Sequence, residues 1–192
     1  MKKILAILLT VVLVLSLTAC GNNPVSDTEK TDKAEVSVKN SLEILNSVWN
    51  SYPEDEKFPV LGGSDNATMD APDTFPIDDA DILDSILGFP ASSADSIDDA
   101  ASLIHAMNAN TFTCGAFHVK NADDISALTE AIKDNIFQRQ WLCGFPDKLV
   151  IVTIGDYVVS FFGANDIVNP FITQLNTAYP SAEIVVDESI AE

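Results

Sequence analysis

The sequence KLVIVTIGDYVVSFFG, residues 148–163, is typical of two strands joined by a tight turn. Residues 148–154 and 157–163 are almost uniformly apolar, and Gly155-Asp156 between them is a two-residue turn in which glycine supplies a positive φ. A strand with one face in water alternates apolar with polar side chains, whereas these two strands do not. Both faces of the sheet that contains this hairpin are therefore expected to be covered.

The hairpin lies at the centre of a longer pattern over residues 111–187. A strand is expected at residues 111–120 and a helix at 121–140; beyond the hairpin, a helix is expected at 166–178 and a strand at 183–187. This order is a split βαββαβ unit. It closes most simply as a four-stranded antiparallel sheet of ferredoxin-like type, with the strand order 4-1-3-2 and both helices on one face. The predicted fold class is α+β.

The second face of this sheet has to be covered by the residues that precede it. Apolar side chains at helical spacing predict helices at residues 34–50, 78–87 and 92–108, with Asp78 as the cap of the second helix and Gly88 at its end. Prolines and glycines between the first two helices predict an irregular wrap. The N-terminal helices are expected to cover the second face, which gives a sandwich of helices, sheet and helices.

The first residues of the chain have the pattern of an export signal. Lys2 and Lys3 precede an apolar run at residues 4–17, which is short for a membrane span. Residues 17–21, Leu-Thr-Ala-Cys-Gly, then resemble the lipobox of bacterial lipoproteins. That resemblance implies cleavage before Cys20, a diacylglyceryl group on its sulfur, and a protein held by lipid on the outer face of the bacterial cytoplasmic membrane. Two acyl chains anchor stably, whereas one binds reversibly.

The domain organisation follows from this signal. Residues 1–19 are the signal peptide, residues 20–33 form a flexible polar tether, and residues 34–192 form a single α+β domain. Within the domain, residues 34–110 are helical and acidic, and residues 111–187 form the βαββαβ core.

The mature chain is strongly acidic. Cleavage removes two lysines, so the formal net charge changes from −19 to −21. This charge disfavours nucleic acid and anionic headgroups as partners, because both require clustered Lys and Arg. Residues 54–99 hold thirteen acidic residues against one lysine. Many of these acids stand where they favour a helix N-terminus, and Asp65, Asp70 and Asp73 are the candidates for a calcium site formed by one loop.

Two cysteines remain beside Cys20. Cys114 and Cys143 are either a disulfide, which an oxidising compartment favours, or two buried thiols. In the order 4-1-3-2 one strand separates them by about 10 Å, so a bond requires Cys143 to lean across from its loop. His118 shares a strand face with Cys114, but about 13 Å away, too far for both to bind one metal ion. His105 is expected at a helix end against the core.

Two blocks of sequence carry a family resemblance. Residues 107–115, MNANTFTCG, and residues 139–148, RQWLCGFPDK, resemble small lipoproteins of Gram-positive bacteria, some of which carry the label bacteriocin transport accessory protein. No activity comes with this resemblance. The label otherwise belongs to thioredoxin-like proteins with a Cys-x-x-Cys motif, which is missing from this sequence.

The expected function is that of a lipid-anchored extracytoplasmic module, rather than an enzyme, that binds a protein, peptide or small ligand. We assign no catalytic residue, cofactor or metal ligand. Two alternatives stay open at this point: a cysteine-dependent enzyme or redox accessory protein that uses Cys114 and Cys143, and an acidic binder of divalent cations.

Overall fold

The computed structural model describes residues 37–107, 110–142 and 144–190. The predicted signal peptide, Cys20 and the tether lie outside the described residues, as does Cys143. The chain divides into two units, residues 1–32 and 33–192, and the second unit contains every described residue. Within the described ranges, none of the helices combines the length and apolar character that crossing a bilayer requires.

One antiparallel sheet organises the described part of the chain, and it has eight strands in the order β2-β1-β4-β5-β7-β6-β8, with β3 also paired to β4. The strands are β1 (Val60–Gly62), β2 (Thr68–Met69), β3 (Asp73–Thr74), β4 (Ile97–His105), β5 (Thr113–Val119), β6 (Lys148–Ile154), β7 (Tyr157–Gly163) and β8 (Glu183–Ser189). The predicted α+β class is confirmed.

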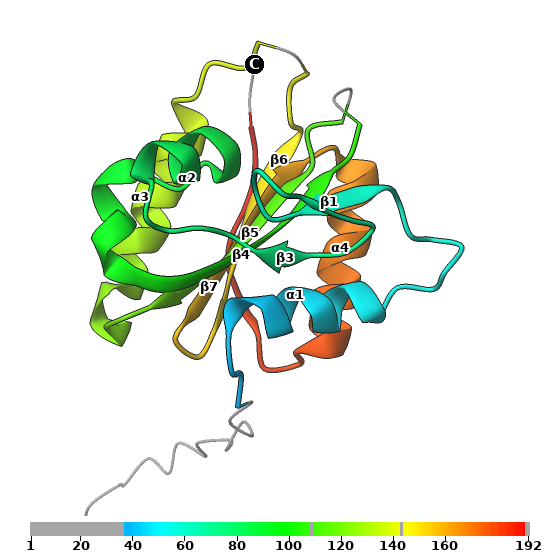
Figure 1. Ribbon diagram of the computed structural model, residues 1–192, viewed down its shortest axis with the longest axis horizontal. Coiled ribbons are helices and arrows are strands. Elements are labelled where there is room, and N and C mark those ends of the chain that lie inside the picture. The colour runs from blue at the N-terminus through cyan, green and yellow to red at the C-terminus, as the bar shows by residue number, and fades with distance from the viewer. Residues whose placement is uncertain (1–36, 108–109, 143, 191–192) are drawn as a thin grey trace, which may run out of the picture. The chain divides into compact units, whose positions relative to one another are not determined.

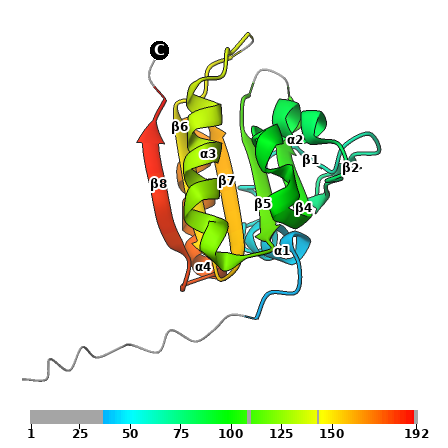
Figure 2. The ribbon, with the colours of Figure 1, turned by 90° about the vertical axis from the view of Figure 1, so that its left-hand side faces the viewer.

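The helices cover both faces of the sheet in pairs. They are α1 (Ser41–Asn50), α2 (Ala80–Leu87), α3 (Ile125–Phe137) and α4 (Asn165–Ala178), with short 3-10 helices η1 (Ala91–Ser96) and η2 (Ala122–Asp124). Figure 1 shows α2 and α3 on one side of the sheet and α1 and α4 on the other. In Figure 2 α3 lies over the sheet beside the edge strand β8. Helices cover both faces, as predicted, but the predicted arrangement is wrong: each face carries one N-terminal helix and one core helix, whereas both N-terminal helices were expected on the second face.

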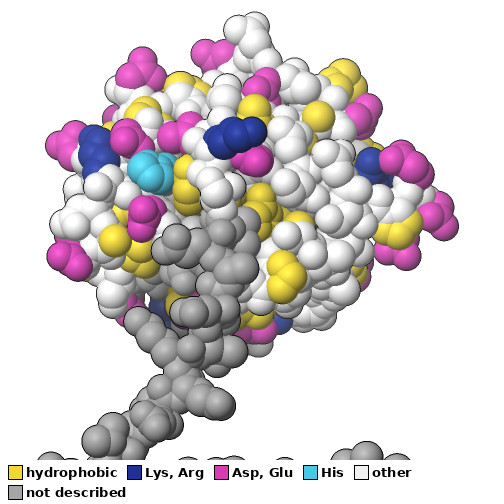
Figure 3. All heavy atoms as spheres, turned by 90° about the horizontal axis from the view of Figure 1, so that it is seen from below, with side chains coloured by type: hydrophobic (Ala, Val, Ile, Leu, Met, Phe, Trp, Pro, Cys, Tyr) yellow, Lys and Arg dark blue, Asp and Glu magenta, His cyan; other side chains and the backbone are white. Residues whose placement is uncertain are grey.

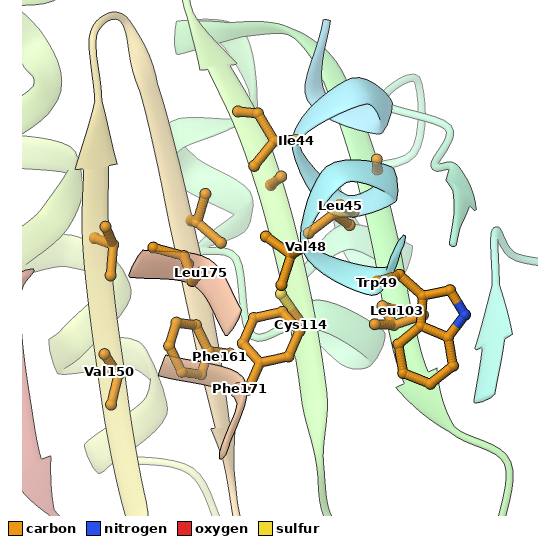
Figure 4. Close-up of a cluster of buried hydrophobic side chains, with 14 of the residues drawn as sticks. Ile44, Leu45, Val48, Trp49, Leu103, Cys114, Val150, Phe161, Phe171 and Leu175 are labelled. Atoms are coloured by element: carbon orange, nitrogen blue, oxygen red, sulfur yellow. The ribbon is translucent and has the colours of Figure 1, made fainter. Parts of the chain in front are cut away.

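The hairpin strands have apolar side chains on both faces because both faces are buried. Val150, Val152 and Phe161 are at most 1% exposed and pack under α1 and α4. Figure 4 shows Val150 and Phe161 on neighbouring strands with Phe171 and Leu175 of α4 above them. Leu149 and Val158 are fully buried on the opposite face, against α2 and α3.

The predicted ferredoxin-like sheet is wrong in its strand order. The four strands of the predicted core are arranged as β5-β7-β6-β8, so the last strand pairs with β6 and not with β5. Both crossovers therefore step across the sheet in the same direction, from β5 past β7 and from β7 past β6. Because β7 runs antiparallel to β5, two crossovers of the same hand must put their helices on opposite faces. This is why α3 and α4 lie on different sides, where both were expected on one.

The predicted helix at residues 92–108 is also wrong, and this error explains the first. Residues 97–105 form β4, which pairs with β5 and so fills the position expected for the last strand. Residues 100–103 are all buried, and the apolar residues in and around this run have the spacing that is also typical of one face of a helix. Three further short strands occupy the stretch that was expected to be irregular, so the sheet grows from four strands to eight.

The remaining elements agree with the predictions to within four residues at each end, except that α1 begins seven residues after the predicted start at residue 34. Both hairpin strands have the predicted bounds, and Gly155 in the turn has φ 55. α1 begins at Ser41 after the cap Asn40, and α2 is capped by Asp79, one residue after the predicted Asp78. Gly88 ends α2 in the left-handed conformation, with φ 68.

Candidate functional site

An open cleft of about 590 Å³ lies between the β1–β2 loop, β3 and the start of α2. Its lining includes four aspartates, namely Asp65, Asp73, Asp78 and Asp79. Of the residues that the structure describes, no Lys or Arg lines it. Acidic side chains are also scattered over other surfaces, such as the end of the domain in Figure 3. The cleft differs from such surfaces because it is hollowed.

The wall formed by the β1–β2 loop is fixed onto the sheet through Ser102 of β4. The hydroxyl of Ser102 accepts a hydrogen bond from the Gly63 amide at 2.9 Å and donates one to the Gly63 carbonyl at 3.2 Å. Gly62 has to be glycine here, because a Cβ on it would lie 2.2 Å from the backbone nitrogen of Asp73. This close approach brings the chain at Gly63 beside Asp73 and shapes the cleft.

The four aspartates differ in what they already bind. The Asp79 carboxylate accepts from the amides of Asp81 and Ile82 and so caps α2. The Asp73 carboxylate accepts from the Thr68 hydroxyl and the Thr74 amide, and these hydrogen bonds hold the pKa of Asp73 below its ordinary value. The carboxylates of Asp65 and Asp78 make no hydrogen bond or ion pair with any described residue. Two of the four charges are therefore free to meet a ligand.

The three aspartates considered as candidates for a calcium site do not line one site together. Asp65 and Asp73 line the cleft, whereas Asp70 is outside its lining and has a left-handed backbone with φ 59. The part of the chain that the structure describes contains no group of three His, Cys, Asp or Glu side chains placed to hold a metal ion.

Cys114 is a free thiol in the structure and is completely buried beneath α1 and α4. Figure 4 shows its sulfur beside Val48 of α1. Burial raises the pKa of the Cys114 thiol, so the thiolate that a nucleophile or metal ligand needs is disfavoured. Because Cys143 lies outside the described residues, the disulfide between these two cysteines stays a prediction.

The two histidines occupy opposite ends of the sheet. His118 lies at the end of β5, partly exposed, with its Nδ1 at 2.5 Å from Asp98 Oδ1. His105 ends β4, not a helix as was predicted; its Nδ1 accepts from the Met107 amide at 3.0 Å and its ring stacks on Phe58. Burial lowers the pKa of His105. Neither histidine lines the cleft.

The two blocks that carry the family resemblance meet at one end of the sheet, where β5 and β6 begin. Thr111 of the first block contacts Gly144 of the second so closely that a Cβ on Gly144 would lie 2.8 Å from Thr111 Cγ2. Trp141 packs edge-on against Phe162 of β7, with ring centroids 5.3 Å apart. Leu142 beside it is 93% exposed.

The sequence did not predict that Asp78 and Asp79 would line the same cleft as Asp65 and Asp73. The signal in the sequence was limited to the turn residues Gly62-Gly63-Ser64-Asp65-Asn66, which indicated a loop but not the strand against which the loop packs.

Comparison of the chain with family models, curated proteins and solved structures finds no match to any of them.

Proposed function

We propose that this chain is a lipid-tethered extracytoplasmic binding module that takes a cationic group of a peptide or small ligand into the acidic cleft. The observation that carries this proposal is the pair of unengaged carboxylates, Asp65 and Asp78, in a cleft of about 590 Å³ without a described lysine or arginine in its lining. A ligand ammonium or guanidinium group is the natural counterpart of such a pair.

The formal charge of the chain, −19 before cleavage, favours the same partner. An acidic protein attracts cationic ligands over a distance of about 8 Å at physiological salt, and the cleft supplies the short-range contacts. The alternative that relies on a reactive cysteine has less support, because the Cys114 thiol is sealed in the core with a raised pKa.

The binding proposal predicts that a trilysine peptide binds the intact chain and that Asp65→Asn/Asp78→Asn weakens this binding about three- to thirtyfold. This estimate assigns a few tenths to 1 kcal/mol to each solvent-exposed charge pair. Titration calorimetry at low salt measures the affinities.

Asp123→Asn/Asp124→Asn is the matched control, because it removes the same two charges from an exposed site at η2. The control should retain nearly the wild-type affinity. Equal weakening in both double variants would mean that the peptide affinity depends only on the net charge of the protein, which would contradict binding in the cleft.

The tether proposal is supported by the lipobox-like residues 17–21 and by the resemblance of residues 107–115 and 139–148 to small lipoproteins. It predicts that the wild-type chain incorporates labelled palmitate in expressing cells and that Cys20→Ser abolishes this labelling, because the sulfur that accepts the lipid is gone. Autoradiography of the immunoprecipitated protein measures the incorporation. Labelling that persists in Cys20→Ser would contradict lipidation at Cys20.

A further inference from the structure

A single β-bulge joins His118 to the start of α1. Ile97 pairs with Val119 and Asp99 pairs with His118, so Asp98 is an extra residue on β4 and two aspartates lie opposite one histidine. The Asp98 carboxylate contacts the His118 ring at 2.5 Å. The Asp99 carboxylate accepts a hydrogen bond, also at 2.5 Å, from the backbone amide of Ser41.

Ser41 is the first residue of α1 and is completely buried. Its hydroxyl also donates to the Asp99 carbonyl at 3.4 Å, so side chain and backbone of Asp99 both hold this first turn. The two aspartates of the bulge are adjacent in sequence. Asp98 contacts His118 and Asp99 contacts Ser41, and these two partners are more than seventy residues apart.

The surroundings of His118 are strongly acidic. The Tyr157 ring lies 4.8 Å from the His118 ring, between centroids. The pKa of Tyr157 is raised by burial first and then by four carboxylates, Asp99, Asp98, Glu43 and Asp156, which come from β4, α1 and the β6–β7 turn. Of the nearby lysines, Lys120 donates its ammonium to the Asp95 carbonyl, and Lys39 meets Glu43 through its backbone amide.

Among the described residues, the basic group that the structure places in contact with a carboxylate of the bulge is the His118 ring. Its side chain is 30% exposed and that of Asp98 is 51% exposed, so both can exchange protons with solvent. Histidine is the residue type that ordinarily changes charge between about pH 5 and pH 8.

We propose that the charge on His118 controls how firmly the first turn of α1 is held to the sheet. With a charged ring, the Asp98 contact is an ion pair and one of the four negative charges around the bulge is neutralised. When the ring loses its proton, that contact falls to a neutral hydrogen bond, the carboxylates repel one another, and the bulge holds Ser41 less firmly. The first turn of α1 is thus held more firmly by a charged His118 ring than by a neutral one.

Amide hydrogen exchange at Ser41, measured by NMR on the intact chain between about pH 5 and pH 8 and divided by the intrinsic rate, tests this proposal. Protection of the Ser41 amide should fall about two- to fivefold as pH rises, which is the size expected for the loss of one exposed ion pair. The midpoint of this fall should coincide with the midpoint of the pH-dependent change in the His118 ring resonances. His118→Gln should abolish the step, and His105→Gln should retain it.

Two results would overturn the proposal. One is a Ser41 protection that stays constant in the wild-type chain while the His118 ring titrates, which needs no variant to fold. The other is a step that survives unchanged in His118→Gln, which would assign it to another group.

Discussion

Phe161→Ala and Phe117→Ala should each lower the free energy of unfolding by about 3–5 kcal/mol, although they remove rings from opposite faces of the sheet. Phe161 is fully buried on the face under α1 and α4, with its ring 4.8 Å from that of Phe171. Phe117 is fully buried on the other face, 4.6 Å from Phe89, and its ring covers Gly115. Truncation of either ring leaves a cavity that the strands cannot close.

Urea denaturation followed by circular dichroism measures both changes. Val185→Ala is the control, because Val185 is 48% exposed on β8 and its loss should change stability by less than about 0.5 kcal/mol. If only one of the two phenylalanine variants is strongly destabilised, one face of the sheet is open to solvent and the two-sided sandwich is wrong.

Trp49→Ala should also cost about 3–5 kcal/mol, because Trp49 joins α1 to the strands that build the cleft. Its ring is 4% exposed and lies 5.3 Å from the rings of both Tyr52 and Phe58. Its Nε1 donates to the Asp70 carbonyl at 3.0 Å and so holds a residue with a positive φ. Removal of the indole loses both the packing and this hydrogen bond.

Trp49→Phe separates the two contributions. It keeps an aromatic ring but leaves the Asp70 carbonyl without this donor, which should cost about 1–3 kcal/mol. Trp141→Phe is the matched control, since Trp141 is only half-buried, and its cost should stay below about 1 kcal/mol. A cost below about 1 kcal/mol for Trp49→Ala would show that α1 does not hold the cleft strands.

The local pattern of the sequence was a reliable guide where neighbouring residues decide the structure. The Gly155-Asp156 turn and its two apolar strands depend on contacts close in sequence, and the predicted bounds are those observed. Residues 97–105 depend instead on burial between β5 and the N-terminal strands. An apolar run buried from both sides has no alternation, so its local signal does not separate strand from helix.

One local error propagated into the topology. A helix at residues 97–105 leaves the edge of β5 free for the last strand, and both core helices then lie on one face. With β4 in that position, β8 pairs with β6, and the two core helices lie on opposite faces.

The cleft could not be predicted from the sequence for a similar reason. The Ser102 hydroxyl fixes Gly63 across thirty-nine residues, a contact that neither segment signals alone.

The strand order is the claim on which the sandwich, the cleft and the bulge at Asp98 all depend, and interstrand nuclear Overhauser effects test it most directly. The structure predicts backbone contacts between Val186 of β8 and Ile151 of β6, and between Ala101 of β4 and Ala116 of β5. Contacts between β8 and β5, with residues 97–105 helical, would contradict the structure and restore the ferredoxin-like order.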